Sequence, residues 1–115
     1  MKKSIHVGGG LRDAARRFAD VWQRAERGEP VEAEDNVTFL TWSALAAVMT
    51  DKRHELLRHL RRHPAPSIRA LARDLGRDYK RVHADVEALA RVGLIERDKT
   101  AVRVMIDEIQ ASLRL

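Results

Sequence analysis

Residues 67–97 read SIRALARDLGRDYKRVHADVEALARVGLIER, and this is the most informative stretch of the chain. Ser67 and Asp78 are residue types that begin helices, because their side-chain oxygens accept hydrogen bonds from the free N–H groups of the first turn. Gly76 lies between the two helices that they predict, and Gly93 ends the second. Two helices joined by a glycine-containing turn and followed by a β-hairpin are typical of a winged helix-turn-helix, so we expect a mainly α (α+β) chain built around this motif.

The apolar side chains of this stretch support both helices. They recur at three- and four-residue spacing, which places them on one face of each helix. The expected inward residues are Ile68, Leu71, Ala72 and Leu75 in the first helix, and Val82, Val86, Leu89 and Ala90 in the second. A β-hairpin wing is expected as strands 94–97 and 101–106 around the polar tip Asp98-Lys99-Thr100. Asp107 then predicts a last helix over residues 108–113.

Nearer the N-terminus, the sequence predicts a short strand over residues 4–7 and an amphipathic helix over residues 11–27. The triplet Gly8-Gly9-Gly10 breaks the strand, and Gly28 and Pro30 end the helix. The helix carries a single apolar stripe formed by Leu11, Ala14, Ala15, Phe18, Val21, Trp22 and Ala25.

Three further elements are expected between this helix and residues 67–97. Residues 37–40 are β-prone and are expected to pair with the first strand. Thr41 predicts a helix over residues 42–49, and Thr50 predicts another that ends before Pro64.

We divide the chain into two parts on this basis. Residues 37–115 are expected to form the winged helix-turn-helix DNA-binding domain. Residues 1–36 are expected to be an N-terminal extension for dimerisation or partner binding, because a winged domain does not require them. The predicted dimer contacts are Leu11, Phe18, Val21 and Trp22. The alternative is that this apolar stripe packs against its own domain.

The net charge of +5 is confined to one region. Residues 51–91 contain eleven Lys and Arg against six Asp and Glu, whereas the rest of the chain contains eleven of each sign. A localised excess of positive charge is the electrostatic footprint of a DNA-binding protein. The alternative is an Arg-rich solvated surface without a nucleic-acid partner.

The candidate DNA contacts cluster on three segments. Recognition helices meet base edges with their N-terminal residues, and helix N-termini bind phosphate. The second helix offers Arg77, Tyr79, Lys80, Arg81, His83 and Ala84; the start of the first helix offers Ser67 and Arg69; the wing offers Arg97, Lys99 and Arg103. Each of these roles has an alternative. Tyr79 could pack in the core, and His83 could be partly buried in its helix. The hairpin could be solvated without contacting DNA.

Other chemistry has little support. The chain has no Cys, which excludes disulfides and thiolate metal sites and is typical of the cytoplasm. The first ten residues lack the apolar core of a secretory signal, and no apolar run is long enough to span a membrane. His59 and His63 share a helix face but lack an obvious third zinc ligand. The sequence therefore predicts a protein that is not an enzyme and that needs no cofactor or metal.

The same region resembles the MarR-like winged-helix regulators of prokaryotes, in particular the HVO_A0114-type family of predicted DNA-binding proteins. The segments that carry the resemblance are above all Ser67–Ala72 and Gly76–His83, with Asp78-Tyr79-Lys80-x-Val82-His83 as the most specific one. Further matching segments are Phe39, Thr41–Leu45, Lys52-Arg53, Asp85-Val86, Ala88-Leu89, Gly93–Arg97 and Asp107–Ile109. The resemblance implies a DNA-binding regulator. It also implies a possible antitoxin role, because members can be encoded beside small toxin-like proteins.

Two functions are therefore expected. The first is a transcriptional regulator, a repressor or autorepressor, that binds a palindromic site on double-stranded DNA as a homodimer. The alternative is the antitoxin of a type II toxin-antitoxin pair, which neutralises a small protein toxin by direct binding and autoregulates its operon. The antitoxin would bind its toxin through the N-terminal extension.

Overall fold

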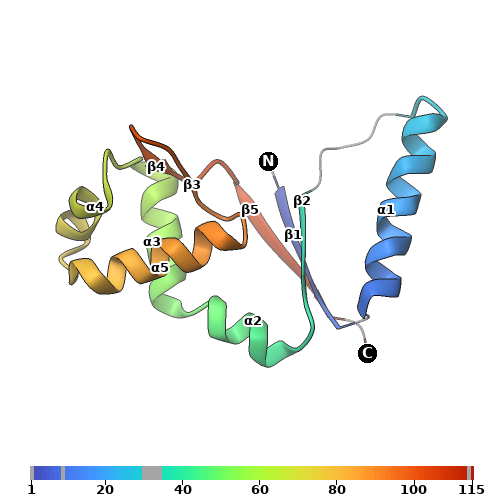
Figure 1. Cartoon of the computed structure of the whole chain (residues 1–115), viewed down its shortest axis with the longest axis horizontal. Helices are drawn as coiled ribbons and strands as arrows, with labels where there is room; N and C mark the ends of the chain where they lie inside the picture. Colours follow the sequence, from blue (N-terminus) through green and yellow to red (C-terminus); the bar gives the residue numbers. More distant parts are fainter. Residues whose placement is uncertain (1, 9, 30–34, 114) are drawn as a thin grey trace. The chain divides into compact units, whose positions relative to one another are not determined.

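The computed structural model describes residues 2–8, 10–29, 35–113 and 115 (Figure 1). The chain is a mixed α and β protein that forms two compact units. The sheet unit comprises Met1–Leu45 and Glu108–Leu115, and the helical unit comprises Ala46–Asp107. The helical unit is thus inserted in sequence between two parts of the sheet unit.

The sheet unit is built on three parallel strands: β1 (Lys2–Val7), β2 (Asp35–Phe39) and β5 (Glu108–Leu113). Their order is β2-β1-β5, so β1 is central and pairs along its length on both sides (Figure 1). Ile5 is opposite Val37 on one side and Ala111 on the other. Ile5 and Val7 are buried, as expected for a central strand with β-branched side chains.

Helix α1 (Gly10–Glu26) connects β1 to β2. Its start follows Gly8, whose φ of 75° lies in the left-handed region that favours glycine. The Arg17 Nη2 donates a hydrogen bond to Thr38 Oγ1 of β2 at 3.0 Å. The predicted strand, the amphipathic helix and the pairing of the second strand with the first are all confirmed.

The helical unit contains most of the remaining helices. Helix α2 (Trp42–Val48) begins in the sheet unit and ends in the helical unit. Helix α3 (Asp51–Arg62), helix α4 (Ile68–Leu75) and helix α5 (Tyr79–Arg91) follow. Each begins after a predicted cap, because Thr50, Ser67 and Asp78 accept hydrogen bonds from backbone N–H groups three residues later.

A hairpin of β3 (Glu96–Arg97) and β4 (Val102–Arg103) follows α5. Val102 also exchanges two backbone hydrogen bonds with Ala65, which precedes α4, at 2.7 and 2.9 Å. The hairpin is therefore tied to the segment between α3 and α4, and its position relative to these helices is fixed by backbone bonds.

The core of the helical unit is aliphatic. Its largest fully buried side chains are Leu56, Leu60, Leu71, Val82, Val86 and Leu89. Full burial of one such side chain stabilises the fold by about 1.5–3 kcal/mol, so these six are a major part of its stability. Leu75 and Ala90, also predicted to face inward, are half-buried.

Several expectations differ from the structure. The hairpin strands are shorter than the expected 94–97 and 101–106. The predicted last helix over residues 108–113 is wrong, because this segment is strand β5. Its alternating apolar residues, Ile109, Ala111 and Leu113, have the period of a strand, and pairing with β1 outweighs a local helical preference. The compact units also differ from the expected division between residues 36 and 37, because β2 and β5 both pair with β1.

Candidate nucleic-acid interface

Helices α4 and α5 form the frame of the candidate site. They pack against each other across the turn at residues 76–78 (Figure 1). Gly76 makes this turn possible with a φ of 62°, and its N–H donates to the carbonyl oxygens of Ala72 and Arg73 at the end of α4. Asp78 Oδ2 then accepts from the N–H of Arg81 at 3.2 Å and begins α5. The turn therefore places the first residues of α5 beside the first helix of the pair.

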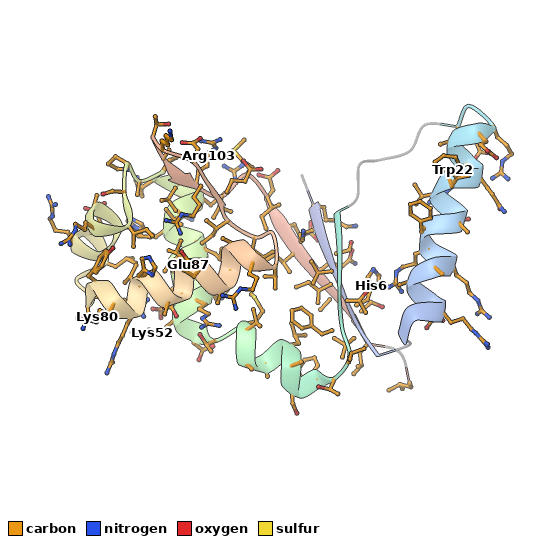
Figure 2. All side chains as sticks on the ribbon, viewed as in Figure 1. His6, Trp22, Lys52, Lys80, Glu87 and Arg103 are labelled. Atoms are coloured by element: carbon orange, nitrogen blue, oxygen red, sulfur yellow. The ribbon has the colours of Figure 1, made fainter. Side chains whose placement is uncertain are left out.

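The first turns of α5 present positive charge to solvent. Lys80, Arg81 and Ala84 are exposed, and Figure 2 shows Lys80 extending from the start of the helix. Within the described residues, the side chains of Lys80 and Arg81 make no hydrogen bond or ion pair. These two cations are therefore available to an anionic partner without breaking an internal interaction.

A shallow pocket of about 290 Å³ lies where the starts of α4 and α5 meet the hairpin. Six of the sequence-predicted DNA contacts line it together: Ser67, Arg69, Tyr79, His83, Arg97 and Lys99. They come from three segments that are separated in sequence. The sequence predicts these residues as three separate groups, on the first helix, the second helix and the hairpin. The structure brings members of all three groups to one pocket.

An aromatic and cationic contact joins the two helices in this pocket. The guanidinium carbon of Arg69 lies 4.7 Å from the centre of the Tyr79 ring, and the centres of the Tyr79 and His83 rings are 5.8 Å apart. Tyr79 is 37% exposed, so it lies at the surface rather than in the core. His83 is half-buried, which agrees with the alternative of partial burial for this residue.

The tip of the hairpin is ordered by Asp98. Its Oδ1 accepts hydrogen bonds from the Thr100 hydroxyl at 2.7 Å, the Thr100 N–H at 2.8 Å and the Ala101 N–H at 3.0 Å. Its Oδ2 accepts from Arg103 Nη1 at 3.0 Å. The Thr100 hydroxyl is the main reason that the pKa of Asp98 lies well below its usual value, with the Thr100 N–H and Arg103 adding to the effect. These bonds fix the backbone on either side of Lys99.

The hairpin cations differ in their availability. Arg97 Nη1 donates to Glu87 Oε1 of α5, and the same oxygen lies 3.7 Å from His83 Nε2. Arg103 contacts both Asp98 and Glu96. Figure 2 shows Glu87 on α5 and Arg103 on the hairpin. Arg97 and Arg103 therefore have acidic partners in the fold, whereas Lys99 has none within the described residues.

Arg77, unlike Lys80 and Arg81, is paired with a carboxylate and mostly buried. Its Nη2 donates to Asp85 Oδ2 at 2.8 Å, and only 20% of its side chain is exposed. Arg53 Nε of α3 donates to Asp85 Oδ1 at 3.0 Å. The sequence alone did not indicate this cluster, because Arg53 and Asp85 are too far apart along the chain for any local spacing to link them.

The predicted dimer contacts lie on α1. Phe18 and Trp22 are 69% and 58% exposed, and their rings stack with centres 6.3 Å apart. Val21 is half-buried. Leu11 belongs to α1, but its side chain lies outside the described part of the structure. The sheet unit thus presents a pair of aromatic rings to solvent.

Metal ligands and membrane spans are not found among the described residues. No three His, Cys, Asp or Glu side chains are grouped there as a metal site would require, although the His59 and His63 rings are 5.2 Å apart. The helices described are all too short or too polar to cross a bilayer.

Comparison with known families places the candidate site inside the matched region. The family model HVO_A0114 matches residues 48–111, which include α3, α4, α5 and the hairpin. No match was found among curated proteins or solved structures.

Proposed function

This chain belongs to the HVO_A0114 family, and we propose that it is a sequence-specific DNA-binding regulator of the MarR-like winged-helix type. The observation that carries the proposal is the pair Lys80 and Arg81, exposed on the first turns of α5 beside a pocket with further cations. In a helix-turn-helix, this part of the second helix meets base edges in the major groove. Arg and Lys suit guanine, whose O6 and N7 both accept hydrogen bonds.

The pocket next to these residues suits the DNA backbone. Ser67 begins α4, and the free N–H groups of a helix N-terminus attract phosphate. Arg69 and Lys99 add positive charge from two sides, and the Tyr79 hydroxyl is a further donor. In this proposal, α5 reads sequence and the pocket fixes the position of the helix on the duplex.

The hairpin is proposed to contribute mainly through Lys99. Arg97 and Arg103 are occupied by Glu87 and Asp98, so their first role is to hold the hairpin against α5 and to shape its tip. Lys99 lies at that tip and lines the pocket, where it can neutralise a phosphate. In this proposal the hairpin contacts DNA through Lys99 alone, and its arginines stabilise its own structure.

Dimerisation is proposed to involve the exposed rings of α1. Two-fold dimers of helix-turn-helix proteins bind palindromic sites with one recognition helix in each half-site. Phe18 and Trp22 offer apolar area that solvent does not favour. The protein would then act as a repressor or autorepressor at a palindromic operator.

An antitoxin role is the second candidate, and the same exposed rings favour it. A toxin that covered Phe18 and Trp22 would bind the sheet unit, whereas DNA would bind the helical unit. Pull-down with the neighbouring gene product separates the two roles. A complex that forms with the wild type and is lost in the variant Trp22→Ser supports the antitoxin role. If no complex is recovered, the role as a transcriptional regulator is the one that remains.

Binding to DNA is tested by fluorescence anisotropy with duplexes from the protein's own upstream region. The variant Lys80→Ala/Arg81→Ala is expected to lose at least about tenfold in affinity, and the slope of log K against log salt should fall by about 0.9 for each phosphate that is no longer neutralised. The control Arg12→Ala/Arg16→Ala removes the same charge from exposed positions of α1. Equal binding by both variants would contradict the proposal.

A further inference from the structure

Asp85 joins three parts of the helical unit through its two carboxylate oxygens. It lies in α5, and it accepts from Arg53 of α3 at 3.0 Å and from Arg77 of the turn at 2.8 Å. Its side chain is only 14% exposed, and those of the two arginines are 19% and 20% exposed. The three charges thus form a compact, mostly buried cluster in the helical unit.

Arg53 extends this cluster to a fourth element. Its Nη1 donates to the carbonyl oxygens of Ala47 and Val48 at 3.3 and 3.1 Å. Carbonyl groups at the end of a helix have no partner within the helix, so a guanidinium group there completes the end of α2. One side chain therefore links the end of α2, the first turn of α3 and the middle of α5.

We propose that Asp85, with Arg53 and Arg77, is a positioning device that sets the orientation of α5, and that Arg77 acts through it rather than as a DNA contact. This inference rests on the proposed function, because the orientation of α5 determines where Lys80 and Arg81 meet the bases. Buried ionic groups are known in some proteins to favour one arrangement of the chain over alternatives. Charge-assisted hydrogen bonds of arginine also fix direction as well as distance.

The two possible roles of Arg77 give different results. A phosphate contact acts on every DNA sequence equally and adds about 0.9 to the salt slope. A positioning residue acts on the base contacts, so its removal lowers the preference for the correct sequence and leaves the salt slope unchanged.

The test uses the full chain and the variant Arg77→Met, which keeps the pair of Arg53 and Asp85. The probes are a duplex selected by the wild-type protein from a randomised pool and a duplex of the same length with shuffled sequence. We expect the ratio of the two affinities to fall at least about tenfold, the effect of removing one base contact, with an unchanged salt slope. A salt slope reduced by about 0.9 with the ratio unchanged would overturn the proposal in favour of a phosphate contact.

A second measurement needs no DNA. Residual dipolar couplings of backbone amides report the orientation of α5 relative to α3 in solution. We expect the couplings along α5 to change relative to those of α3 in Arg77→Met and in Asp85→Asn, and to stay at wild-type values in Arg91→Met, which removes an exposed arginine from the last turn of the same helix.

The two measurements separate the possible failures. Unchanged couplings in Arg77→Met overturn the positioning role whether or not DNA is bound. If the wild-type chain selects no duplex, the proposed function fails, and the couplings still decide how α5 is oriented. If Asp85→Asn does not fold, the test relies on Arg77→Met. This variant keeps the ion pair of Arg53 with Asp85, so the carboxylate still has one arginine partner.

Discussion

The Arg69 guanidinium carbon lies 4.7 Å from the centre of the Tyr79 ring, so the first turn of α4 is held against the first residue of α5. The positive charge of arginine is attracted to the negative face of an aromatic ring, and both groups line the pocket that we assign to the DNA backbone. The contact therefore shapes the site as well as the fold.

A double-mutant cycle at this contact should give a coupling of about 0.5–1 kcal/mol, the range for exposed pairs of this kind. The variants are Arg69→Gln, Tyr79→Leu and their combination, and the measurement is the free energy of unfolding in urea. Tyr79→Phe serves as the control, because it keeps the ring and should keep the coupling. Additive losses of stability would show that the two groups do not interact.

Substitution of Gly76 should destabilise the turn through backbone strain alone. Its φ is 62°, and a Cβ atom added there would meet nothing within 4 Å. We expect Gly76→Ala to cost about 1 kcal/mol in the free energy of unfolding, and Gly76→Asn to cost less, because asparagine tolerates this region better. Equal losses of stability in both variants, measured by urea unfolding, would point to a different cause.

Asp98 should make the hairpin sensitive to acid. Its pKa in the folded chain is lowered, chiefly by the Thr100 hydroxyl, so its charged form contributes stability that is present above its unfolded pKa and is lost as the pH falls towards the folded pKa. The difference in unfolding free energy between wild type and Asp98→Ala should therefore be constant near neutral pH and shrink below about pH 4. Denaturation at a series of pH values checks this, and a difference that did not vary with pH would contradict it.

Removal of the exposed rings of α1 should affect assembly rather than folding. The variant Phe18→Ser/Trp22→Ser is expected to elute with the mass of a monomer where the wild type elutes as a dimer. Its affinity for a palindromic duplex should fall about a hundredfold, because the second half-site is no longer bound by a linked subunit. Gln23→Ser, at an exposed polar position of the same helix, is the control. A wild-type chain that is already monomeric on DNA would refute the dimer.

The helix starts and the turn between α4 and α5 can be predicted from the sequence, because each depends on residues that are close together along the chain. Ser67, Gly76 and Asp78 act at the positions expected for caps and a turn. The sequence predicts a helix over residues 108–113, where the structure has strand β5, because pairing with β1, at the other end of the sequence, determines the conformation of this segment. Similarly, the sequence does not distinguish Arg77 from the other basic residues of this region. Its difference becomes clear only from the structure, in which Arg77 and Arg53 both donate to Asp85.

The pairing of β1 with β5 also has a consequence for the order of folding. Ile5 is opposite Ala111, so this pairing must close nearly the whole chain into a loop, whereas α4 and α5 meet through a short turn. Pairing between residues distant in sequence is slow, because the loop must close, at a cost in entropy, before the two strands can bond. During synthesis, the helices can therefore associate while β1 still lacks its second neighbour.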